Sequence, residues 1–134
     1  MLRHAKRMLV PLVVLSACLF LLAPQLGSST EYGRVTEMTL HANPFNYHGA
    51  CPVTINFYGL IKVDGPNTII YGVTRSDGGT GEGPQTLHFT GAGQKSIHFT
   101  WRLGGPGENY DGWAQTGSGN TRSNKAEFHI HCAR

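Results

Sequence analysis

Histidines are the residues of this sequence whose type and spacing come closest to a chemical site. If the strands that carry them form a hairpin, His88 and His98 face each other on its outward side. His129 and His131 are two residues apart, so they share one face of the last predicted strand. Two neighbouring imidazoles can bind a transition metal, so these four histidines are the candidate metal ligands.

Neither histidine pair has the companions that a metal centre requires. Catalytic zinc sites use three protein ligands, and no acidic third ligand accompanies either pair. If the hairpin and the last strand belong to different sheets, the four histidines cannot converge. We therefore expect no cofactor, and a small metal-binding or enzymatic protein that uses paired surface histidines remains an alternative.

Aromatic side chains are the second candidate for a functional site. Alternation places Tyr58 on the outward face of the longest predicted strand, and Tyr110 and Trp113 flank a loop. Aromatic rings beside polar groups suit sugar stacking or a protein partner, so these three residues are the candidate ligand-binding residues. The alternative is structural: Trp113 packs inward, and the opening segment covers Tyr58.

The sequence lacks the arrangements that support enzyme chemistry. A Gly-x-Ser-x-Gly nucleophile motif is absent, and no paired strand carboxylates suggest a glycosidase. Asp77 and Glu82 lie in a glycine-rich loop with too few oxygen ligands for calcium. We therefore predict that the protein is not an enzyme.

The elements that would position these residues are β-strands. Alternating apolar and polar residues predict them, most clearly in 51–63, where the odd-numbered positions face the core. The full set of predicted strands is 35–42, 51–63, 68–75, 86–90, 96–103, 112–116 and 124–132, with 86–90 and 96–103 as the hairpin. About seven short strands are typical of an all-β, immunoglobulin/fibronectin-III-like antiparallel sandwich. A jelly-roll or other Greek-key sandwich is the alternative fold.

Two cysteines bracket most of the predicted strands. Cys51 begins the second strand and Cys132 ends the seventh, and both have inward parity. In an up-and-down order these two positions meet at one end of the sandwich, so we predict a disulfide between them. Such a bond would contribute about 4.5 kcal/mol in the chain-entropy model. It also indicates an oxidising, extracytoplasmic compartment.

The N-terminus has the organisation of a secretory signal peptide. Basic residues precede an apolar run over 8–23, and small polar residues follow it. We therefore assign 1–28 to a signal-peptide helix, 29–34 to a short linker and 35–134 to one β-sandwich domain. The short apolar run favours cleavage, and an uncleaved anchor is the alternative.

Charge excludes one large class of partner. The chain has 11 Lys+Arg and 8 Asp+Glu, but Arg3, Lys6 and Arg7 leave with the leader. The mature protein is then close to neutral and has no basic cluster, so we expect no nucleic-acid binding. We expect membrane contact only through the N-terminal segment, as an uncleaved anchor or through a lipid on Cys18, which ends a lipobox-like Leu15-Ser-Ala-Cys18.

Short motifs spread over 47–132 resemble a set of uncharacterised secreted bacterial domains. The motifs are Cys51-Pro-Val-Thr, Phe57-x-Gly59-x-Ile61, Arg75-Ser-Asp-Gly78, Gln85-Thr-Leu-x-Phe89-Thr90, Trp101-x-Leu-Gly104, Gly112-Trp-x-Gln115 and Ser123-Asn-Lys-Ala-x-Phe128. The domains that they resemble pair one early with one late cysteine and are presumed immunoglobulin-like. The resemblance implies an export route and a fold, and it assigns no functional residue.

These observations favour a non-catalytic, extracytoplasmic β-sandwich that binds a protein or glycan partner, either secreted or at the cell envelope. The loop Gly104–Asp111 is the expected contact region. A polysaccharide-binding module that uses the exposed aromatic residues is the main alternative.

Overall fold

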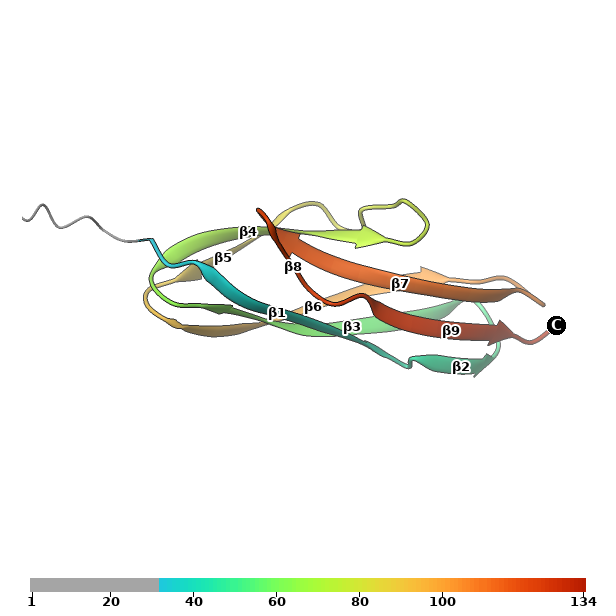
Figure 1. Ribbon diagram of the computed structural model, residues 1–134. Coiled ribbons are helices and arrows are strands. Elements are labelled where there is room, and N and C mark those ends of the chain that lie inside the picture. The colour runs from blue at the N-terminus through green and yellow to red at the C-terminus, as the bar shows by residue number, and fades with distance from the viewer. Residues whose placement is uncertain (1–31) are drawn as a thin grey trace, which may run out of the picture.

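Residues 32–134 are described by a computed structural model, and they form two packed β-sheets (Figure 1). The small sheet contains β1 (Val35–Asn43), β3 (Val53–Val63) and β6 (Gly93–Leu103), in the order β1-β3-β6. The large sheet has the order β2-β9-β7-β4-β5, with β8 paired to β7. Its strands are β2 (Asn46–Gly49), β4 (Asn67–Arg75), β5 (Gln85–Phe89), β7 (Asn109–Ser118), β8 (Thr121–Arg122) and β9 (Ala126–Cys132).

The strand order is immunoglobulin-like. In the letters used for that fold, β1, β3 and β6 occupy positions A, B and E, and β9, β7 and β4 occupy G, F and C. The fifth strand, β5, joins β4 at the edge of the large sheet, which is the position of strand C′ in variable-type domains. The prediction of an all-β sandwich is therefore confirmed.

The prediction of a wholly antiparallel, seven-strand sandwich is wrong in one respect, because the large sheet is mixed. The first strand stops before Pro44, and the chain crosses to the large sheet, where β2 pairs in parallel with the end of β9 (Figure 1). Proline has no N–H to donate to a ladder, so it ends the pairing of β1. The residues of β2 and β8 were not predicted as strands, because two to four residues are too few to show alternation.

The predicted hairpin of 86–90 with 96–103 is also wrong. The fifth strand pairs with β4, and β6 pairs with β3, so the connection between β5 and β6 crosses from one sheet to the other. Alternation reveals which residues face inward, but it does not reveal which sheet a strand joins. His88 and His98 therefore belong to different sheets and do not face each other.

The core lies between the sheets, and it is built from the inward positions that alternation predicts. Phe57 on β3 and Phe128 on β9 are fully buried and meet edge to face, with ring centroids 5.9 Å apart. Phe99 stacks on Phe57 at 4.9 Å, and Trp101 meets Phe128 at 5.3 Å. Buried aromatic pairs in these geometries contribute beyond their area alone.

The disulfide Cys51–Cys132 closes one end of the sandwich, with a Cα–Cα distance of 5.4 Å and a sequence separation of 81 residues. Residues 1–31, which include the expected signal peptide, Cys18 and half of the linker, lie outside the described residues. At the start of the described chain, the amide of Gly33 donates to the carbonyl of Pro66 at 2.8 Å. No helix long and apolar enough to cross a membrane occurs among residues 32–134.

Candidate binding surfaces on the two outer faces

Three aromatic side chains form a row across the outer face of the small sheet. Cross-strand register places His41 of β1 opposite Tyr58 of β3, and Tyr58 opposite His98 of β6. The ring of Tyr58 stacks on His41 with centroids 5.6 Å apart and on His98 with centroids 4.7 Å apart. Directly opposed residues on neighbouring strands have their Cβ atoms about 5 Å apart, which explains this spacing. We call these three side chains the ring row.

The ring row presents edges to solvent, because each face of the Tyr58 ring lies against an imidazole. Tyr58 is still 40% exposed. Nε2 of His98 lies 3.2 Å from Oδ1 of Asn56, so this ring is held in place by a hydrogen bond. A shallow depression beside the row is lined by Thr39, His41, Tyr58, Gly59, Leu60, Ser96, Ile97 and His98. This surface therefore offers a line of aromatic rings that carry hydrogen-bonding groups.

The other two predicted aromatic residues lie elsewhere, so the three do not form one site. Tyr110 points into the sandwich, where its hydroxyl lies 2.9 Å from Oγ of Ser76 and its ring meets Trp101 edge to face at 5.9 Å. Trp113 lies on the outer face of the large sheet, because Gly112 and Ala114 take the buried positions beside it. Nζ of Lys125 lies 4.3 Å from the centroid of the Trp113 ring.

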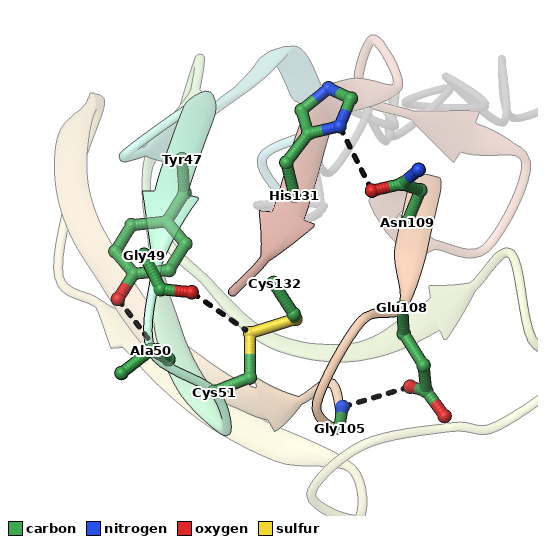
Figure 2. The surroundings of a disulfide bond; sticks show 9 residues. All are labelled: Tyr47, Gly49, Ala50, Cys51, Gly105, Glu108, Asn109, His131 and Cys132. Carbon is green, nitrogen blue, oxygen red and sulfur yellow. Dashed lines mark hydrogen bonds between the residues drawn. A yellow bond between two sulfur atoms is a disulfide. The ribbon is translucent and has the colours of Figure 1, made fainter. Parts of the chain in front are cut away.

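The loop Gly104–Asp111, which was the expected contact region, is a short, tethered turn. The strand β7 begins at Asn109, and the amide of Gly105 donates to the Glu108 carboxylate at 2.8 Å (Figure 2). The amide of Cys132 donates to the carbonyl of Glu108 at 2.9 Å. Gly104 has a φ of 93°, and a Cβ there would lie 2.8 Å from Sγ of Cys132. This turn therefore serves to pack the disulfide.

Three histidines lie on the outer face of the large sheet at its disulfide end. Nδ1 of His129 lies 2.7 Å from Oδ1 of Asp111, and Nδ1 of His131 lies 3.0 Å from Oδ1 of Asn109. The ring of His48, on β2, stacks on His131 with centroids 4.5 Å apart and an interplanar angle of 9°. We call His48, His129 and His131 the histidine face.

Sequence reasoning paired His129 with His131, but it did not identify His48, whose ring stacks on His131. His48 lies on a four-residue strand whose parallel pairing leaves no alternation signal. His88 lies apart from these histidines, because β5 is at the opposite edge of the same sheet. Its Nδ1 is 3.0 Å from Oγ1 of Thr68 on β4. Among residues 32–134, no three His, Cys, Asp or Glu side chains converge as ligands for one metal ion.

Two groups with shifted pKa values lie near the β4–β5 loop. Burial acts to raise the pKa of Asp77, but hydrogen bonds from the Gly79 amide and the Arg75 guanidinium outweigh it and hold that pKa below its ordinary value. Burial raises the pKa of the Tyr71 hydroxyl, and the Glu82 carboxylate raises it further. Asp77 thus organises a turn, which agrees with a structural function for the glycine-rich loop.

Comparison with known proteins gives structural similarity without a sequence relationship. No protein-family model matches the chain, and no curated protein matches it.

Solved structures with a similar arrangement of strands share few residues with this chain. The PKD domain of an M14-like peptidase from a Thermoplasmatales archaeon is 20% identical, with a TM-score of 0.42, and the match covers 72% of this chain and 93% of that one. The CARDB domain of a Pyrococcus furiosus protein, solved in complex with di-metal ions, is 15% identical, with a TM-score of 0.47, over 77% and 96% of the two chains. An alkylpurine DNA glycosylase of Pseudomonas fluorescens, bound to DNA containing an abasic site analog, is 12% identical, with a TM-score of 0.48. That match covers 72% of this chain but only 31% of the glycosylase.

Proposed function

We propose that this protein is a non-catalytic, extracytoplasmic binding module that engages a partner through the outer face of its small sheet. The observation that carries the proposal is the ring row of His41, Tyr58 and His98, which crosses all three strands of that sheet. Tyrosine is enriched at protein interfaces because one rigid side chain combines apolar area with a hydrogen-bonding hydroxyl. The three rings of the row are held side by side on a regular sheet, so they are pre-organised for binding.

The orientation of the rings favours a protein partner over a glycan. A sugar binds an aromatic residue by stacking on an open ring face, and both faces of Tyr58 lie against imidazoles. A partner that offers hydrogen bonds can bind the exposed ring edges and the Tyr58 hydroxyl without moving any of the three rings. We therefore place a protein surface first and a polysaccharide second.

The proposed compartment rests on the disulfide, because such bonds persist in secreted and envelope proteins and are rare in the cytosol. The proposed lack of catalysis rests on the state of the two cysteines and on the exposure of the Asp111–His129 pair. Cys51 and Cys132 are bonded to each other, so neither supplies a thiolate. The Asp111–His129 pair lies on open surface, with side-chain exposures of 79% and 50%, where water and salt weaken such a pair.

The test is affinity capture with matched variants. Immobilised wild-type protein is exposed to a cell-envelope extract and, separately, to a glycan panel. Tyr58→Thr removes the centre of the ring row, and Ile70→Thr removes a side chain that is 61% exposed on the outer face of the large sheet. We expect one defined protein to be retained by the wild type and by Ile70→Thr, and lost with Tyr58→Thr. Equal retention by both variants would contradict the proposal, and retention of a glycan would favour the second candidate.

A further inference from the structure

The histidine face contains a pair of side chains that are arranged to chelate a metal ion. Parallel pairing of β2 with β9 places His48 directly beside His131, on the same outward face. Their rings are nearly parallel, with an interplanar angle of 9° and centroids 4.5 Å apart. The pair lies on the opposite sheet from the ring row, so an inference from it is independent of the proposed binding surface.

The tautomer of His131 leaves one ring nitrogen free to bind a cation. Nδ1 of His131 lies 3.0 Å from Oδ1 of Asn109, as Figure 2 shows. An amide oxygen only accepts hydrogen bonds, so the proton is on Nδ1 and the lone pair is on Nε2. Histidines that bind metals characteristically donate their other ring N–H to a carbonyl or carboxylate, because this fixes the ring and raises its basicity. Asn109 supplies that second contact here.

We propose that His48 and His131 form an open, two-histidine binding site for Cu²⁺. Structural zinc takes four protein ligands and catalytic zinc three, which this face does not offer. Cu²⁺ has the highest affinity of the divalent first-row metals for nitrogen ligands, and water can complete its tetragonal coordination.

Metal binding requires the exposed side chain of His48 to change its orientation. Bonds of about 2.0 Å from one ion to two adjacent nitrogens place those nitrogens about 3 Å apart. The rings are now stacked, with centroids 4.5 Å apart and nearly parallel planes, so their in-plane lone pairs do not point at one ion. The ring of His48 must therefore rotate until its lone pair and that of Nε2 on His131 converge. His48 is exposed and can make this rotation, while His131 keeps its hydrogen bond to Asn109.

The test is Cu²⁺ titration of the full chain, purified without a histidine tag, at pH 7.5. We compare the wild type with His48→Gln, His131→Gln and a control, His88→Gln, and we follow binding by calorimetry and by nitrogen couplings in the electron paramagnetic resonance spectrum. We expect one equivalent of Cu²⁺ with two coordinated imidazoles. Either substitution in the pair should weaken binding about tenfold or more, and His88→Gln should leave it unchanged.

A second variant tests the positioning role of Asn109. Asn109→Ala frees the His131 tautomer, and loss of such an outer contact typically weakens metal affinity about tenfold. The proposal is overturned if His48→Gln binds Cu²⁺ as tightly as the wild type, or if His88→Gln is as damaging as His48→Gln. Circular dichroism of each variant separates loss of the site from loss of the fold.

Discussion

Removing the disulfide should produce the largest loss of stability available from one covalent change. The bond between Cys51 and Cys132 closes a loop with a sequence separation of 81 residues. In the chain-entropy model, that loop restricts the unfolded chain by about 4.5 kcal/mol at 25 °C. Small domains have net stabilities of about 5–15 kcal/mol, so a variant with both cysteines replaced by alanine should lose a third or more of its stability.

The same loss of about 4.5 kcal/mol predicts how far the thermal midpoint should fall. The unfolding entropy of a domain of about 100 residues is about 0.2 kcal/mol per kelvin, so the midpoint temperature should fall by about 20 °C. The assay is urea and thermal unfolding, followed by the fluorescence of Trp101, which is buried in the wild type. Reduced wild-type protein should match the double variant, because both have an unrestricted unfolded chain. A loss below about 1 kcal/mol would refute the entropic reasoning.

Substitutions at three further residues test single contacts. The hydroxyl of Thr116 is buried without a hydrogen-bond partner among the described residues. Thr116→Val should therefore raise the free energy of unfolding, measured by chemical denaturation, by about 1–2 kcal/mol. A decrease in this free energy would show that the hydroxyl has a partner. The Asn124 side chain accepts from the Leu40 amide at 2.9 Å and donates to the Leu40 carbonyl at 2.7 Å. Asn124→Ala should destabilise by about 1–3 kcal/mol, and Asn124→Asp by less because aspartate keeps the acceptor. Equal losses would argue against a contribution from the accepted bond. The pKa of Asp77 is lowered in the fold, so its stabilising contribution is present above its ordinary value of 3.8 and is lost as the pH falls through the lower, folded value. Asp77→Asn should therefore lower the urea midpoint at pH 7, and the difference from the wild type should shrink as the pH falls below 3.8. A pH-independent difference would contradict this account.

Alternation predicted seven of the nine strands of residues 32–134, and it contributed to the prediction of the disulfide. The odd-numbered positions of β3 face the core as predicted, and Phe57 among them is fully buried. The inward parity of Cys51 and Cys132 was predicted in the same way, and the assumed up-and-down strand order then placed them at the same end of the sandwich. These features depend on one strand at a time, which is the information that a two-residue period contains.

Pairing between strands could not be predicted in the same way. The connection from β5 to β6 crosses between sheets, and nothing in the alternation of either strand distinguishes this from a hairpin. Trp113 faces outward because the neighbouring positions must be small: a Cβ at Gly112 would lie 2.8 Å from the Phe128 ring. That requirement exists only after Phe128 has been placed in the core.

The candidate surfaces depend on pairing, so they were only partly visible in the sequence. The outward parity of Tyr58 was predicted, but its neighbours His41 and His98 became apparent only from the register of β1, β3 and β6. The stack of His48 on His131 requires a parallel pairing across more than eighty residues of sequence, which follows from the chain crossing between sheets at Pro44.

The central claim is that the outer face of the small sheet binds the partner. The most direct measurement is a nuclear magnetic resonance titration of isotope-labelled protein with the partner that affinity capture identifies. We predict that amide shifts concentrate on β1, β3 and β6 around Tyr58, with those of β7 and β9 unchanged. Shifts confined to the large sheet, or to the turn Gly104–Glu108, would contradict the account.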